Sequence, residues 1–146
     1  MDDIYDLQRF VEAQEQVYGR VLAELRAGAK RSHWIWFIFP QLKQLGRSAT
    51  AQHFGIASLA EADAYWRHPV LGPRLRDCTE LVVSLEGKTA LQVLGWPDEV
   101  KLRSSMTLFE QAAPEEPVFG QALEKYFRGL RDEKTIELLN QAPPRR

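Results

Sequence analysis

The stretch from Ser32 to Gln41, SHWIWFIFPQ, limits most strongly what this chain can fold into. It holds two of the four tryptophans and two of the seven phenylalanines, and residues 34–39 are all large and apolar. Rings at this density belong in the middle of a core or in the wall of a pocket. Periodicity alone leaves the run open between a buried strand and one or two turns of buried helix.

The neighbours of the run favour a helix. Ser32 is suited to cap a helix from His33 to Phe39, and Pro40 would end that helix. The propensity of the large rings leans towards strand, but the chain has no other alternating run that could pair with a strand here. We therefore predict a short helix.

The remaining segments also read as helices. Apolar spacings of three and four predict one amphipathic helix over 3–26, which Gly28 would end. The patterns at 58–61 and 89–92 are capping boxes, and Asp132 is suited to cap a last helix. The range 41–58 lacks periodicity and is predicted to be a long loop. Together these patterns predict an all-α fold, a single irregular multihelical domain of about seven helices over 1–142, with a frayed tail at 143–146.

Composition excludes several classes of function. The net charge of -1 over 146 residues gives no field that would attract nucleic acid. No apolar run approaches the length of a membrane span, and the start has no pattern of a secretory signal. We therefore expect a cytoplasmic protein that binds neither nucleic acid nor a membrane. Without metal-ligand spacings or a glycine-rich phosphate loop, the sequence predicts no metal and no cofactor.

Several strings match a known pattern. They are FVEAQ at 10–14, Lys30 with SHWIWFIFPQ at 32–41, EA to Tyr at 61–65, HPVLGPRL at 68–75, KLRSSMTLF at 101–109, and Asp132 with Thr135. On these strings the chain resembles the bacterial family called domain of unknown function 1810, which implies an all-helical single domain without an established activity. Members often carry the automatic label calpastatin, which implies a disordered, repeat-built protease inhibitor. The composition is that of a compact globular protein and the sequence has no repeats, and both observations argue against that label here.

A second, looser likeness is to NADAR domains, thought to act on ADP-ribose derivatives and similar N-glycosides. It rests on the order of a glutamate-led helix, the helix with the Lys101 to Phe109 string, and a later helix with spaced Phe and Leu. By order along the chain, this likeness implies that Glu61 is the pocket glutamate. It also implies a basic pair and an aromatic wall, formed by Lys101 with Arg103 and by Trp34 with Trp36.

The candidate ligand-binding site combines a ring-rich segment with a donor-rich one. A nucleotide-like ligand needs an aromatic face for its base and cations and hydroxyls for its phosphates. The first segment contributes Lys30, Trp34, Trp36 and Gln41, and the second contributes Lys101, Arg103, Ser104, Ser105 and Thr107. The alternative for each is structural, with the rings in the core and the charges on a solvated face.

Two side chains are candidates for catalysis. His33 is a candidate general base, because histidine titrates near neutral pH, and Glu61 is a candidate to activate water. The structural alternatives are a hydrogen-bonded histidine and a glutamate that only completes its capping box.

These observations leave two functions open. The first is binding or processing of a nucleotide-derived small molecule, of ADP-ribose or N-glycoside type, which as an enzyme would be a hydrolase. It requires that the two segments meet around a shared hollow. The alternative is a non-enzymatic protein-interaction module whose partner the sequence does not name. Its signature is a pocket-free surface around Lys101 and an exposed apolar patch elsewhere.

Overall fold

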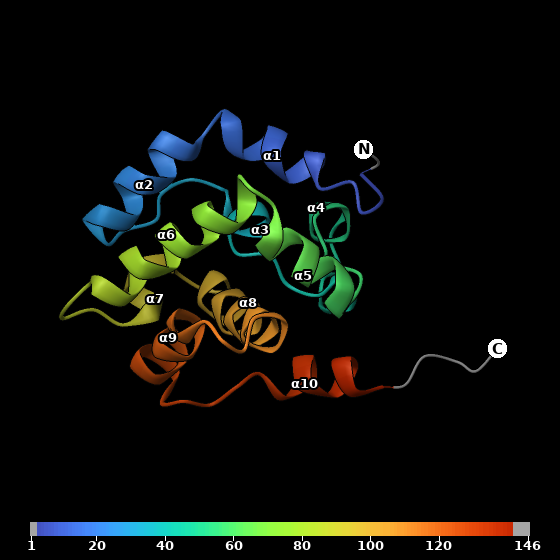
Figure 1. Ribbon diagram of the computed structural model, residues 1–146. Helices are drawn as coiled ribbons and strands as arrows, with labels where there is room; N and C mark the ends of the chain where they lie inside the picture. The colour runs from blue at the N-terminus through green and yellow to red at the C-terminus, as the bar shows by residue number, and fades with distance from the viewer. Residues whose placement is uncertain (1–2, 142–146) are drawn as a thin grey trace.

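The computed structural model describes residues 3–141, and the predicted tail at 143–146 lies outside them. The described part contains ten α-helices, which confirms the all-α class but exceeds the predicted number of about seven (Figure 1). Within residues 3–141 the only β-type pairing is one isolated parallel bridge. The helices are α1 Gln8–Glu15, α2 Tyr18–Ala27, α3 Ile35–Ile38, α4 Ala49–His53, α5 Leu59–Arg67, α6 Leu71–Ser84, α7 Ala90–Leu94, α8 Asp98–Ala112, α9 Pro117–Phe127 and α10 Glu133–Asn140.

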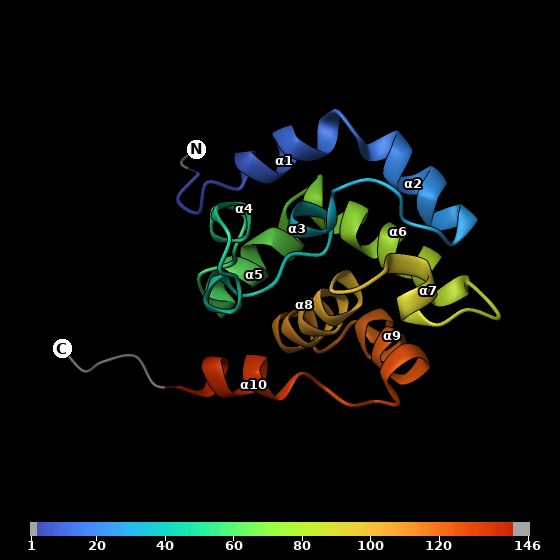
Figure 2. The ribbon, with the colours of Figure 1, turned by 180° about the vertical axis from the view of Figure 1, so that it is seen from behind.

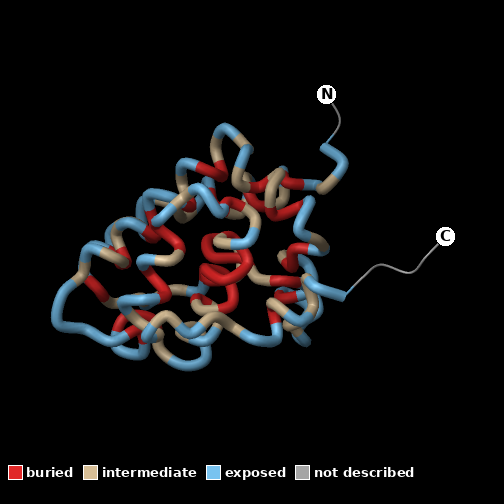
Figure 3. The backbone as a smooth tube through the Cα atoms, turned by 60° about the horizontal axis from the view of Figure 1, so that its bottom comes forward, coloured by how far each residue is buried: buried red, intermediate tan, exposed pale blue. Residues whose placement is uncertain are grey.

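Helix α8 lies in the middle of the molecule and packs against α5, α7, α9 and α10, while α6 packs against α5 and α9 (Figures 1 and 2). Its residues Leu102, Met106 and Phe109 are fully buried. The Phe109 ring lies between Tyr65 and Phe119, with centroid distances of 5.3 Å and 5.9 Å. Buried segments gather at this centre, and exposed ones surround it (Figure 3). None of the helices within residues 3–141 combines the length and the apolar character that crossing a membrane requires.

The predicted helix over 3–26 is two helices. The backbone leaves the helical region at Val17, with φ -129° and ψ -1°, so α1 and α2 meet at an angle. Leu7 is the cap residue of α1, and the Asp3 carboxylate satisfies the start of the helix, because it accepts from the backbone N–H groups of Leu7 at 2.7 Å and Gln8 at 2.9 Å. Gly28 ends α2 as predicted, in the left-handed region with φ 69°.

The helix in the aromatic run is shorter than predicted. It covers only Ile35–Ile38, and the cap position belongs to Trp34, whose side chain makes no capping hydrogen bond. Ser32 is not the cap, because its hydroxyl donates to the Glu24 carboxylate at 2.5 Å. The local pattern assigns the Ser32 hydroxyl to a helix cap, but this hydroxyl is bonded to the carboxylate of a residue eight positions earlier in the chain.

The predicted loop at 41–58 is an ordered excursion. It contains the 3₁₀ turn Lys43–Leu45 and helix α4, whose N-terminus Ser48 caps. Two backbone hydrogen bonds close its neck, from Lys43 N to Ile56 O at 2.8 Å and from Ile56 N to Gln41 O at 2.9 Å. Gly55 permits this closure, because a Cβ there would lie 2.4 Å from the Cα of Lys43.

The predicted helix starts at 58, 89 and 132 are confirmed. The hydroxyl of Ser58 and the carboxylate of Asp132 cap α5 and α10, and Thr89 forms a complete capping box at α7. At α5 the second half of the predicted box is absent. The Glu61 carboxylate accepts from the backbone N–H of Ala57 at 3.0 Å and does not reach back to Ser58.

Candidate functional site

The ring-rich and donor-rich segments meet where α3 lies beside α8. The Lys101 ammonium lies 4.9 Å from the centroid of the Trp36 ring, and the Lys30 ammonium lies 5.1 Å from that of Trp34. Asp98, the first residue of α8, connects the two lysines. Its carboxylate oxygens lie 2.7 Å from Lys30 Nζ and 3.7 Å from Lys101 Nζ. Two lysine–tryptophan pairs therefore share one carboxylate.

The space between the segments is small. A hollow of about 10 Å³ lies between them, and its lining includes Trp36, Phe39, Gln41, Gly55 and Lys101. This volume holds about one water molecule. The hollow of ligand size that the sequence predicts between the two segments is therefore not found there. The Trp36 indole N–H is buried here and has no acceptor within residues 3–141.

A buried carboxylate that we did not predict holds the turn before α3. Glu24 accepts hydrogen bonds from Arg31 N at 2.9 Å, Ser32 N at 3.1 Å, Ser32 Oγ at 2.5 Å and Trp34 Nε1 at 2.8 Å. Burial alone would raise the pKa of Glu24, but these hydrogen bonds lower it to about 2. The Trp34 ring is 1% exposed, so this tryptophan is a core residue tied to Glu24. The same turn carries Lys30.

Arg103 does not line the hollow beside Trp36. Its guanidinium donates from Nε to the carbonyl oxygen of Leu130 at 2.7 Å and from Nη2 to that of Arg131 at 2.8 Å. These two bonds attach the connection between α9 and α10 to α8.

The hydroxyls of α8 are also occupied or buried. Ser104 Oγ donates to the Asp132 carboxylate at 3.0 Å, and Thr107 Oγ1 accepts from Asp132 N at 2.9 Å. Ser105 is fully buried, and its hydroxyl has no partner within the described range. Of the donor-rich segment, only Lys101 lines the hollow beside Trp36.

Replacing Arg103 with alanine is expected to lower the free energy of unfolding by about 1–2 kcal/mol, because two carbonyls lose a charged donor. Urea unfolding measures this loss. Arg20 is exposed on α2 and has no hydrogen bond or ion pair within residues 3–141, so Arg20→Ala is the control, with a change within about 0.5 kcal/mol. Equal stability of Arg103→Ala and the unmodified protein would mean that this side chain is free for a ligand.

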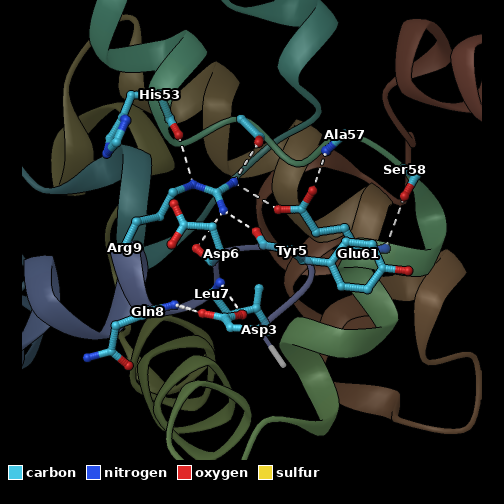
Figure 4. Close-up of polar contacts among 11 residues, drawn as sticks. Asp3, Tyr5, Asp6, Leu7, Gln8, Arg9, His53, Ala57, Ser58 and Glu61 are labelled. Carbon is cyan, nitrogen blue, oxygen red and sulfur yellow. Dashed lines mark hydrogen bonds and ion pairs between the residues drawn. The ribbon is translucent and has the colours of Figure 1, made fainter. Parts of the chain in front are cut away.

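Glu61 belongs to a separate polar network centred on Arg9 (Figure 4). All five N–H groups of the Arg9 guanidinium have acceptors. They are the carbonyl oxygens of Tyr5, Asp6, His53 and Gly55 and the carboxylate of Glu61, at distances from 2.6 to 3.0 Å. The Glu61 side chain is 4% exposed, and Ala57 N occupies its other oxygen.

Glu61 does not line the hollow at Trp36. Gly55 lines that hollow, while its carbonyl oxygen accepts from Arg9. A second hollow, of about 440 Å³ and open to solvent, borders Arg9, Glu61 and His53 on the outer side. Both oxygens of Glu61 already accept hydrogen bonds there.

His33 is exposed in the turn before α3 and makes no hydrogen bond or ion pair within the described part of the chain. Across residues 3–141 no group of three or more His, Cys, Asp and Glu side chains is placed to hold a metal ion.

Comparisons with known proteins identify one similar solved structure and one matching family. The crystal structure of the conserved hypothetical protein Rv1873 from Mycobacterium tuberculosis is similar, with a TM-score of 0.94 and 50% sequence identity. The match covers 96% of this chain and 100% of that one. No curated protein matches the sequence. The family model described as "Protein of unknown function (DUF1810)" matches residues 4–139, and the chain therefore belongs to this family.

Proposed function

We propose that this protein binds a nucleotide-derived small molecule, of ADP-ribose or N-glycoside type, whose ring stacks on Trp36. The observation that carries the proposal is the Lys101 ammonium over the Trp36 ring, next to Lys30 and to a buried indole N–H that has no acceptor among residues 3–141. A base stacks on an aromatic ring regardless of its identity, and lysines pair with phosphate oxygens. The likeness to NADAR domains supports the same ligand class.

The ligand takes the place that Lys101 now fills. Lys101 is held by its contact with the Trp36 ring and by a 3.7 Å ion pair with Asp98, and its side chain is 22% exposed. Contacts of this kind contribute on the order of 1 kcal/mol, so the flexible side chain swings aside at little cost. The ring of Trp36 then becomes accessible, and the displaced ammonium pairs with the phosphate of the ligand.

The proposal is one of binding, and it assigns no catalytic step. Both carboxylate oxygens of Glu61 already accept hydrogen bonds, from Arg9 and from Ala57. A hydrolase activity that uses Glu61 and His33 stays a prediction. Cytoplasmic localisation also stays a prediction.

A protein-interaction module is the second candidate, and the exposed side chain of Trp96 favours it. Trp96 is 77% exposed just before α8, with Leu91 at 53% and Val100 at 48% in the same ten-residue stretch. Tryptophan is enriched at the centres of protein interfaces. None of these three side chains lines the hollow at Trp36, so a ligand experiment separates the two functions.

The test is the melting temperature in the presence of ADP-ribose, NAD or AMP. A ligand that binds only the native state raises the unfolding free energy by about 2.7 kcal/mol at a hundred times its Kd. We expect a shift that Lys101→Met reduces and that the control Lys134→Met, at an exposed lysine on α10, leaves unchanged. No shift with any of the three ligands at millimolar concentration would refute the proposal and leave the interaction module.

A further inference from the structure

The proposed site contains one negative charge that a binder of anions does not need. We infer that Asp98 is its specificity-determining residue and excludes bare inorganic anions by filling the position between Lys30 and Lys101. This inference rests on the proposed function, because it concerns the same two lysines.

The geometry shows how differently the two lysines are held. Lys30 is 7% exposed in its side chain and lies 2.7 Å from Asp98, and it also donates to the Ser32 carbonyl oxygen at 2.5 Å. Lys101 lies 3.7 Å from the same carboxylate and is 22% exposed. Two ammonium groups and one carboxylate leave the cluster with a net charge of +1. Lys101 is thus the mobile cation, and Asp98 stays with Lys30.

The backbone also fixes the position of Asp98. It is the first residue of α8, a helix of fifteen residues, and the helix dipole favours a negative charge at that end. An anion that approaches Lys101 therefore comes within a few ångströms of a carboxylate that does not move. Repulsion at that distance weakens binding by at least about fivefold even with the screening of water. A ligand with a ring offsets this loss by stacking on Trp36, whereas phosphate or pyrophosphate has no such contact.

Inorganic pyrophosphate is the probe, because it carries the charge without a ring. In calorimetric titrations of the full chain at low salt, we expect Asp98→Asn to bind pyrophosphate at least about fivefold more tightly than the unmodified protein. The amide preserves the shape of the side chain and still accepts from Lys30. Adding Lys101→Met to Asp98→Asn should remove the gain.

Glu99 provides a matched control. It is the next residue of α8 and has no ion pair within residues 3–141. Glu99→Gln changes the net charge of the protein by the same amount as Asp98→Asn. We expect it to change pyrophosphate affinity by less than about twofold, because water and salt screen the field of this charge. Should Asp98→Asn unfold the protein, Asp98→Ser replaces it, because serine also suits a helix start.

The inference is overturned if the Asp98 variant binds pyrophosphate no more tightly than the unmodified protein. It is also overturned if Glu99→Gln gives the same gain, since the effect would then be one of overall charge. Failure of the proposed function looks different. In that case ADP-ribose, NAD and AMP leave the unmodified protein unaffected, while the gain for pyrophosphate in Asp98→Asn persists.

Discussion

Replacing Arg9 with methionine is expected to lower the free energy of unfolding by about 3–5 kcal/mol. The Glu61 side chain is 4% exposed and Arg9 is its partner at 2.8 Å, so the variant buries an unpaired carboxylate. Four backbone carbonyl oxygens lose a donor at the same time. The start of α1 and the neck of the 41–58 excursion lose the side chain that joins them.

Arg67 supplies the matched control for this prediction. It pairs with Asp63 at 2.9 Å one helical turn away, but its side chain is 76% exposed. Arg67→Met should therefore leave the free energy of unfolding almost unchanged. Urea unfolding of both variants measures the difference. A mild effect at Arg9 would show that Glu61 does not depend on the pair, and its predicted catalytic role would regain support.

Glu24→Gln is expected to cost about 3 kcal/mol near neutral pH, because the pKa of Glu24 falls from 4.5 to about 2 on folding. A lowered pKa in the folded state stabilises the protein above the ordinary pKa. That contribution is lost as the pH falls from 4.5 towards 2. The amide also places an N–H₂ group against N–H and O–H donors, so part of the network at Ser32 and Trp34 breaks.

The measurement is the unfolding free energy of both proteins across this acid range. The gap between the unmodified protein and Glu24→Gln should narrow as the pH falls, because protonation removes the charge that the variant lacks. Glu86 is exposed after α6, and Glu86→Gln should show almost no gap at any pH. A gap for Glu24→Gln that stays constant down to about pH 3 would contradict the lowered pKa.

The sequence predicted helix starts well, because the signals are local. Thr89 and Asp132 find their partners within three residues, so the cap is visible in the string itself. The break at Val17 was missed, because the apolar spacing from Phe10 to Val21 continues across it. The apolar spacing indicates which side of a helix is buried, but it does not indicate where the direction of the helix axis changes.

The site residues show the same limit. Ser104 and Thr107 contact Asp132, which lies 28 and 25 residues further along the chain, and no spacing rule reaches that far. Glu24 did leave a signal that we did not use. It follows Val21 by three residues on the buried face of α2, where a carboxylate needs donors.

The contact between Lys101 and Trp36 makes the fluorescence of Trp36 sensitive to the position of the Lys101 ammonium group. A positive charge 4.9 Å from the centre of an indole shifts the energy of its excited state. Any event that draws the ammonium away, whether a bound molecule or a change in ionic strength, therefore alters the emission of that one ring. The chain has four tryptophans, so the part of its emission that Lys101→Met changes is the part that reports on this lysine.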